Sequence, residues 1–343
     1  MCLRHQLAAV SQSAVNRVRK LLLALIATAG TALLAGGAAA ATPRNALRDD
    51  AARAVEVAAG VYMVQGASGE ADTNNLGRVG NAGFIVGDTG VLAIDTGTSY
   101  RHGVALLASI RRLTDKPVRL ALITHTRQEF LFGAAAYREQ AIPIHMQRKA
   151  AGLMQARCER CLKTLKQVLG DDAMQGTAMF KPDREFEQSH SIDTIGRRIQ
   201  VLYYGHSSGP GDVAVLDVQS GVLFAGGLLD ELRIPEVQDS DLDGWTHALQ
   251  ALRALPIKAV VPGHGPVATT RVIDSVERYL AQLQARALEL LRAGAALSEV
   301  PDASVLPEFA LWDQYETIHR RNASILFVRF ERDQMFKRAG SQD

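Results

Sequence analysis

The chain has 343 residues, of which 47% are hydrophobic and 22% are charged, an ordinary balance for a globular protein. Its length allows one large domain or two small ones, with enough apolar residues for a sizeable core. The formal net charge is only +2, which excludes a strongly single-signed surface. The sequence therefore predicts no nucleic-acid partner and no attachment to an anionic membrane surface.

Residues 1–41 have the pattern of a secretory signal peptide. A basic segment at 17–20 precedes an apolar run at 21–34, and a Gly- and Ala-rich stretch ends at Ala41. The apolar run is shorter than the roughly 20 residues that span a bilayer, so we expect cleavage near Ala41 and no stable membrane insertion afterwards. Residues 42–51 are predicted to be a linker, and the mature protein is predicted to be periplasmic or secreted.

Beyond the linker, the hydrophobic pattern predicts two groups of strands with helices between them. A strand at 55–64 leads to a Gly- and Asn-rich loop at 66–80, and two apolar runs at 81–88 and 90–97 are typical of a hairpin. Further strands are predicted at 118–123, 142–145, 196–204, 213–217, 221–225 and 259–265, and helices at 100–113, 133–140, 147–169, 242–255 and 270–295. This pattern predicts two sheets packed together with helices outside.

A Cys-x-x-Cys pair, Cys158 and Cys161, lies inside the helix predicted at 147–169. In an exported protein the leading interpretation is a local structural disulfide, because oxidising compartments favour it. A structural zinc knuckle would need a second such pair, which the sequence lacks.

Five segments carry the residues that could form a site. They are Asp-Thr-Gly at 95–97, Thr-His-Thr-Arg-Gln-Glu-Phe at 124–130, Gly-His-Ser-Ser-Gly-Pro-Gly-Asp at 205–212, Phe-Ala-Gly-Gly at 224–227 and Val-Pro-Gly-His-Gly at 261–265. In this order and at these spacings, they resemble the metallo-β-lactamase family, and most of all its exported branch of quinoprotein-associated zinc metallohydrolases. The resemblance implies an αββα sandwich at 52–300, followed by a C-terminal helical extension at 301–343.

Members of this family hold one or two Zn²⁺ ions with imidazoles and carboxylates, and the metal activates a water molecule for hydrolysis. By the resemblance, His125 and His206 match two of the three ligands of the first metal, and Arg127 stands at the third position. A guanidinium group stays protonated and has no lone pair to donate, so Arg127 cannot bind a metal ion.

The second metal site departs further from the family. His264 matches a ligand, whereas Glu129 replaces an Asp, Phe130 replaces a His and Gly227 replaces the bridging Asp. A dinuclear centre is therefore not expected. Asp95 resembles a buried structural Asp of the family, which organises the metal loop.

Two functions remain open at this point. The first is an exported pseudoenzyme, inactive or weakly active and without a metal cofactor. In this hypothesis Arg127 pairs with Glu129 where the metal charge would stand. A cleft lined also by His125, His206 and His264 would bind a small anionic or carbonyl-bearing ligand.

The second is a hydrolase with one zinc ion, held by His125, His206 and His264, that cleaves an ester, thioester, lactone or related bond. Glu129 would then be the catalytic carboxylate. If Arg127 displaced the metal, Arg127→His should complete a set of three imidazoles with His125 and His206. In the C-terminal extension, His319 and Asn322 are further candidates to reach the cleft.

Overall fold

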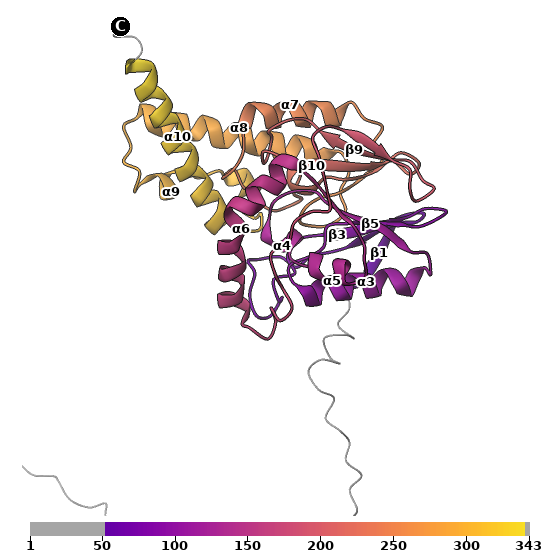
Figure 1. The fold of residues 1–343 in the computed structure, drawn as a ribbon. Coiled ribbons are helices and arrows are strands. Elements are labelled where there is room, and N and C mark those ends of the chain that lie inside the picture. Colours follow the sequence, from indigo (N-terminus) through magenta and orange to yellow (C-terminus); the bar gives the residue numbers. More distant parts are fainter. Residues whose placement is uncertain (1–51, 340–343) are drawn as a thin grey trace, which may run out of the picture. The chain divides into compact units, whose positions relative to one another are not determined.

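The computed structural model describes residues 52–339, which form two stacked sheets with helices on both outer faces (Figure 1). The predicted signal peptide (1–41) and linker (42–51) lie outside the described residues. The αββα arrangement predicted from the sequence is confirmed, including the helical region at the C-terminal end.

The first sheet has seven strands in the order β1-β2-β3-β4-β5-β6-β7. Neighbours are antiparallel from β1 to β4 and parallel from β4 to β7. The strands are β1 (Ala54–Ala58), β2 (Val61–Val64), β3 (Ala82–Val86), β4 (Val91–Ile94), β5 (Val118–Ile123), β6 (Ile144–Gln147) and β7 (Arg184–Phe186). The prediction of a single strand at 55–64 was wrong. The chain turns at Gly60, whose φ of 74° suits glycine, and forms the β1–β2 hairpin.

The second sheet has five strands in the order β12-β11-β10-β9-β8, of which only β11 and β12 are parallel neighbours. They are β8 (His190–Ile192), β9 (Ile199–Tyr203), β10 (Val213–Asp217), β11 (Val222–Phe224) and β12 (Ala259–Val261). The sequence did not predict β7 or β8, because each has three residues and too few apolar positions to show a period.

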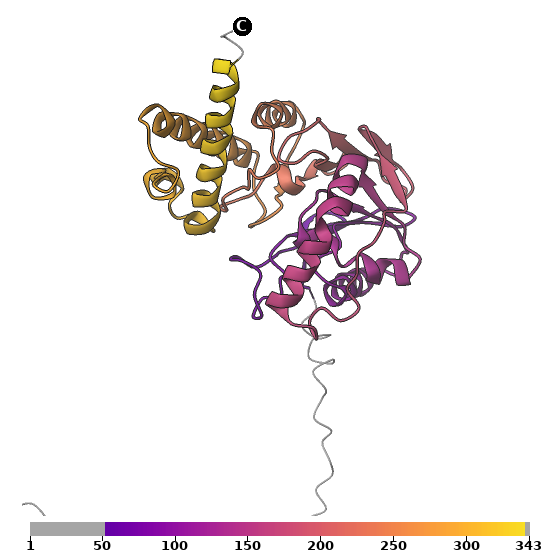
Figure 2. The same cartoon turned by 60° about the vertical axis from the view of Figure 1, so that its left-hand side comes forward.

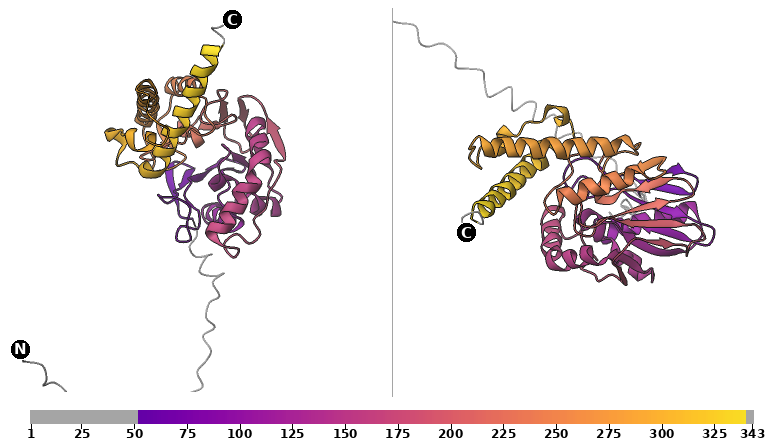
Figure 3. Two further views of the ribbon diagram at one scale, coloured as in Figure 1. Left: turned by 90° about the vertical axis from the view of Figure 1, so that its left-hand side faces the viewer. Right: turned by 90° about the horizontal axis from the view of Figure 1, so that it is seen from above.

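Helices cover the outer face of each sheet (Figures 1 and 3). The first sheet carries α3 (Tyr100–Leu113), α4 (Gln128–Leu131), α5 (Ala134–Glu139) and α6 (Arg148–Leu169), and the second carries α7 (Leu242–Arg253) and α8 (Arg271–Arg292). The short helix η1 (Gly226–Leu228) follows β11, and the elements after α8 are α9 (Val300–Ala303), the short helices η2 (Pro307–Phe309) and η3 (Tyr315–His319), and α10 (Arg320–Ala339). Among residues 52–339, no helix combines the length and apolar character needed to span a membrane.

Side chains of the central strands β4 and β10 are buried on both faces, as expected for an αββα sandwich. In β4, Leu92 and Ile94 pack between the sheets, whereas Val91 and Ala93 pack toward the helices. The strand β10 alternates in the same way, with Val213 and Val215 turned to the other sheet. Three apolar layers therefore hold the sheets and helices in register.

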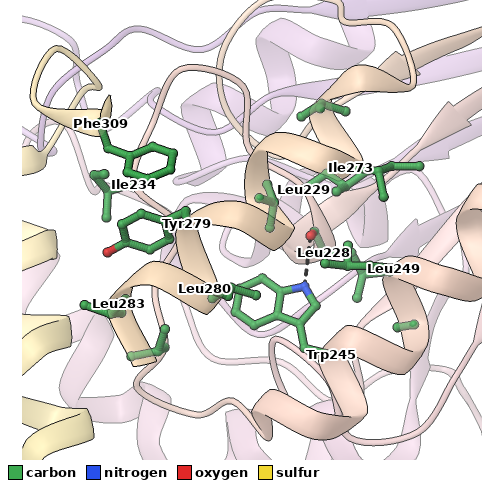
Figure 4. Close-up of a cluster of buried hydrophobic side chains, with 14 of the residues drawn as sticks. Leu228, Leu229, Ile234, Trp245, Leu249, Ile273, Tyr279, Leu280, Leu283 and Phe309 are labelled. Atoms are coloured by element: carbon green, nitrogen blue, oxygen red, sulfur yellow. Dashed lines mark hydrogen bonds between the residues drawn. The ribbon is translucent and has the colours of Figure 1, made fainter. Parts of the chain in front are cut away.

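The outer core of the second sheet is built around Trp245 of α7, which is fully buried (Figure 4). Its indole nitrogen donates a hydrogen bond to the backbone oxygen of Leu228 at 3.0 Å. This bond fixes η1, the segment that follows β11 and leads into the candidate site.

The C-terminal extension shares this core. Ile318, Leu326 and Phe327 are buried in the same apolar cluster as α7 and α8, and α10 lies against α8 (Figures 2 and 3). Asn322 is fully buried; its amide nitrogen donates to the backbone oxygen of Pro235 at 2.7 Å, and its amide oxygen accepts from the backbone nitrogen of Val237 at 3.2 Å.

We predict that Asn322→Ala lowers the free energy of unfolding by at least about 1–3 kcal/mol, because it leaves two buried backbone groups without partners. Ser324→Ala is the matched control, since the Ser324 hydroxyl bonds only within α10, to the backbone oxygen of Arg320. Denaturant unfolding measures both variants. Equal stability of the two would show that Asn322 does not hold the 235–237 segment.

Candidate functional site

The five segments singled out in the sequence meet at one edge of the sandwich. Strands β4 and β5 are parallel neighbours, and β9, β11 and β12 run in one direction in the other sheet, so each set of carboxyl ends lies along one edge. Direct bonds join the two edges, such as that from the backbone nitrogen of Val213 to the backbone oxygen of Thr124 at 2.9 Å.

Asp95 anchors the segment that follows β5. Its carboxylate accepts hydrogen bonds from the backbone nitrogen of Thr124 at 2.8 Å and from the Thr124 hydroxyl at 2.9 Å. The hydroxyl oxygen also lies 2.8 Å from Nδ1 of His125. Burial raises the pKa of Asp95 to about 7. Asp95 thus sets the position of His125 through Thr124 and lines no part of the cavity.

His125 is buried and uncharged. Burial, and then the positive charge of Arg127, lowers the pKa of His125 to about 3. Its ring centroid lies 4.2 Å from that of Phe130, and the same phenyl ring meets His264 edge-on at 5.4 Å. Phe130 therefore lies beside both imidazoles, at the position where the family would have a histidine ligand of the second metal.

Arg127 carries a positive charge in the cleft. Its Nη1 atom lies 2.5 Å from Oε2 of Glu236, in the segment after β11. The expected pairing of Arg127 with Glu129 is corrected here: Glu236 is the direct partner, because this segment folds back over the cleft. Burial by itself would lower the pKa of Arg127, but Glu236 and Glu129 raise it above its ordinary value.

Glu129 and Asp230 hold His264 between them. Nε2 of His264 lies 3.2 Å from Oε1 of Glu129, and Nδ1 lies 2.8 Å from Oδ1 of Asp230. Burial opposes charge on His264, yet the two carboxylates outweigh it and raise the pKa of His264 to about 9. Burial likewise opposes charge on Glu129, but the hydrogen bond and charge of His264 lower the pKa of Glu129 to about 2.

His206 does not join the other two histidines, contrary to the expectation that all three converge. It is exposed, and its Nε2 donates to the backbone oxygen of Asp239 at 2.6 Å. A hydrogen bond from the backbone nitrogen of Asp241 to the backbone oxygen of Ser207 joins the loop after β9 to the loop before α7. Arg127→His alone would therefore not complete a set of three imidazoles.

The position of the family's bridging Asp is Gly227. A Cβ atom there would lie 2.7 Å from Oδ2 of Asp212 and 2.8 Å from Cδ2 of His125, closer than real Cβ atoms come. Asp212 is itself buried and accepts a hydrogen bond from the Ser208 hydroxyl at 2.6 Å. Any side chain at this position would displace Asp212 or His125.

The enclosed part of the cleft is small. His125, Arg127, Glu129 and His264 line a cavity of about 20 Å³, enough for about one water molecule. A second pocket of about 200 Å³, called the outer mouth below, shares Arg233 and His264 with this cavity and is also lined by Gln65 and Ser68.

The C-terminal extension forms one wall of this mouth. The Asp313 carboxylate accepts from the backbone nitrogen of Gly69 at 3.1 Å and from Nη1 of Arg233 at 2.5 Å. Arg233 also donates to the backbone oxygen of Gly69 at 2.9 Å. Asp313 thereby ties the 66–80 loop to the segment that carries Glu236.

These residues do not fit the family's zinc centre. Arg127 has no lone pair, both ring nitrogens of His264 face carboxylates, and His206 lies outside the cavity. Within residues 52–339, no group of three or more His, Cys, Asp or Glu side chains has an arrangement that would hold a metal ion.

Cys158 and Cys161 are free thiols in the described structure, with their sulfur atoms 3.3 Å apart. The predicted local disulfide is not formed in the described structure. The separation exceeds the roughly 2.05 Å of a disulfide bond, because the regular α6 helix keeps residues three apart at a wider spacing.

Sequence reasoning missed Asp230, Arg233 and Glu236. All three lie in the segment after Gly227, which matched no motif of the family. The available signal was the density of charged residues at 230–236 directly after a buried strand. The sequence could not show that this segment returns over the cleft.

Comparison with known proteins identifies the family. The model of the metallo-beta-lactamase superfamily matches residues 76–264, which is more than half of the 343-residue chain. The chain therefore belongs to the metallo-β-lactamase superfamily.

Similar proteins share the fold at low sequence identity. A metallo-beta-lactamase from Pontibacter korlensis is 22% identical, with a TM-score of 0.55 over 67% of this chain and 98% of that one. The mono-zinc form of the metallo-beta-lactamase FIM-1 from Pseudomonas aeruginosa is 17% identical, with a TM-score of 0.53 over 67% of this chain and 94% of that one.

A linear primary-alkylsulfatase from Pseudomonas sp. (strain ATCC 19151) is 22% identical over 262 residues, which cover 65% of this chain and 49% of the relative. The chain thus spans about half the length of this curated relative.

We predict that the stability contributed by His264 depends on pH in the alkaline range. Its pKa is raised from 6.5 to about 9 in the folded state. The contribution is therefore complete below pH 6.5 and is lost as the pH rises through about 9. His264→Gln removes the titrating group, so the stability difference between wild type and this variant should shrink over that window. A difference that stays constant from pH 6 to pH 10 would contradict the arrangement of His264 between two carboxylates.

Proposed function

We propose that this protein is a ligand-binding member of the metallo-β-lactamase superfamily that works without the family's metal centre. The observation that carries the proposal is the Arg127 side chain, which lies in the cleft and pairs with Glu236 at 2.5 Å. A positive charge fixed at a metal-ligand position opposes Zn²⁺ binding by repulsion and by the loss of a donor.

The ligand in this proposal is a small anion or a carbonyl compound, bound at the outer mouth. At about 200 Å³ the mouth is smaller than the roughly 300–1,000 Å³ typical of sites for drug-sized ligands. Arg233 and His264 supply positive charge beside the carboxylates of Glu231 and Asp313, and Gln65 and Ser68 supply hydrogen-bonding groups at the rim. A short-chain alkyl sulfate is a suitable probe, because it is anionic and one relative is named an alkylsulfatase.

The remaining features of the proposal rest on the sequence. The leader at 1–41 supports export to the periplasm or beyond, and assignment to the quinoprotein-associated branch stays a prediction from the resemblance. A mononuclear zinc hydrolase is the second candidate function. It is favoured by the retention of His125, Glu129 and His264 around a single cavity.

One experiment separates the two functions. We predict that protein purified without chelators contains far less than one zinc per chain, and that it binds a short-chain alkyl sulfate in calorimetry without releasing inorganic sulfate. Added zinc should change neither the affinity for the alkyl sulfate nor the absence of sulfate release. About one zinc per chain, together with zinc-dependent sulfate release, would overturn the proposal in favour of the hydrolase.

The location of the ligand is tested with two Gln→Glu variants, each of which adds one negative charge, at the outer mouth or at a distant site. Gln65→Glu at the mouth should weaken binding of the anionic probe, since like charges repel at short range. Gln188→Glu lies in a separate surface groove with Arg148 and Tyr203 and should leave binding unchanged. Equal affinities of the two variants would show that the probe binds elsewhere.

A further inference from the structure

The pair Cys158 and Cys161 lies one turn apart on α6, at the boundary between core and solvent. Cys158 is only 2% exposed and packs in the apolar layer over the first sheet, whereas Cys161 is partly exposed. Neither residue lines the candidate cleft or its mouth. The 3.3 Å between their sulfur atoms brings a buried thiol and an accessible one into direct contact.

The helix makes a bond between these sulfurs possible but strained. Residues three apart on a helix have Cβ atoms about 5–6 Å apart, whereas a relaxed disulfide needs about 3.5–4.5 Å. Forming the bond would tighten one turn of α6, and strain of this kind makes a disulfide easier to reduce. The geometry therefore favours a bond that forms and breaks over a permanent one.

The surroundings give the two thiols different reactivity. The hydrogen bond with Cys158 is the largest effect on Cys161 and, together with the nearby Arg160, lowers the pKa of Cys161 to about 7. The same contact, and then burial, raises the pKa of Cys158. Since the thiolate is the nucleophile in thiol–disulfide exchange, Cys161 is the residue that reacts first.

We propose that Cys158 and Cys161 form a reversible dithiol–disulfide pair that exchanges with small-molecule disulfides. The Cys161 thiolate attacks one sulfur of the small disulfide, forms a mixed disulfide and releases one thiolate. Cys158 then gives up its proton and attacks the Cys161 sulfur, which releases the second thiolate. The two protein thiols are oxidised to one disulfide, and the small disulfide is reduced to two thiols.

The sequence around the pair provides a direct assay. Trypsin cleaves after Arg157, Arg160 and Lys163, so it separates the peptide 158–160 from the peptide 161–163 when the thiols are reduced. A disulfide keeps the two peptides joined. The whole chain is equilibrated with mixtures of oxidised and reduced glutathione, its free thiols are alkylated, and the digest is analysed by mass spectrometry.

We expect the joined peptide to increase with the share of oxidised glutathione and to disappear again when reduced glutathione is restored. No joined peptide at the highest oxidised share would overturn the proposal. A joined peptide that resists reduced glutathione would also overturn it, because it would indicate a permanent structural disulfide.

Single variants test the order of attack. Cys158→Ala should leave Cys161 as a stable mixed disulfide with glutathione, whereas Cys161→Ser should leave the buried Cys158 unmodified. Iodoacetamide labelling of the wild type gives the same information without a mutation, and Cys161 should react well before Cys158. Equal labelling of the two thiols, or equal glutathione adducts in the two variants, would contradict the proposed roles.

Discussion

The ion pair between Arg127 and Glu236 is the interaction on which the rest of the cleft depends. The Arg127 side chain is 23% exposed, so its charge is largely shielded from water and would be costly without a carboxylate beside it. Glu236 provides that carboxylate from the other sheet's segment at 2.5 Å. The pair therefore joins the two halves of the sandwich at the edge where the family's members bind metal.

The remaining charges in the cleft are arranged around this pair. Glu129 is close enough to raise the pKa of Arg127, but its hydrogen bond is to Nε2 of His264. Asp230 forms a second bond with the other ring nitrogen of His264, Nδ1. Arg127, Glu129, Asp230 and His264 thus each face a group of opposite charge, as buried charges require. The arrangement leaves only about 20 Å³ of enclosed space.

The C-terminal extension makes this arrangement possible, because it holds the segment that carries Glu236. Asn322 binds the backbone on either side of Glu236, and Asp313 binds Arg233 and the loop opposite. Arg321 places a second positive charge 3.2 Å from Glu236. The extension therefore positions Glu236 indirectly, through hydrogen bonds from the Asn322 side chain to the backbone of residues 235 and 237.

Much of the fold could be predicted from the sequence, because apolar periodicity is a local signal. The strand at 213–217 and the helix at 100–113 were confirmed with the same bounds. The hairpin at 54–64 was missed because its turn depends on the conformation of Gly60, which leaves no gap in the apolar pattern.

The candidate site was harder to predict than the fold. Motifs at strand ends located His125, Arg127, Glu129 and His264, all of which line one cavity. The partner of Arg127, Glu236, lies 109 residues further along the chain, in a segment that the C-terminal extension binds. Local sequence carries no information about such a long-range pairing, and His206 was misplaced for the same reason.

A double-mutant cycle tests the central role of the ion pair most directly. The free energy of unfolding is measured for wild type, Arg127→Met, Glu236→Gln and the double variant, each with and without excess zinc. We predict a coupling energy of at least about 1 kcal/mol that zinc does not change. A coupling below about 0.5 kcal/mol, the value of an ordinary surface pair, or stabilisation of the wild type by zinc would contradict the account.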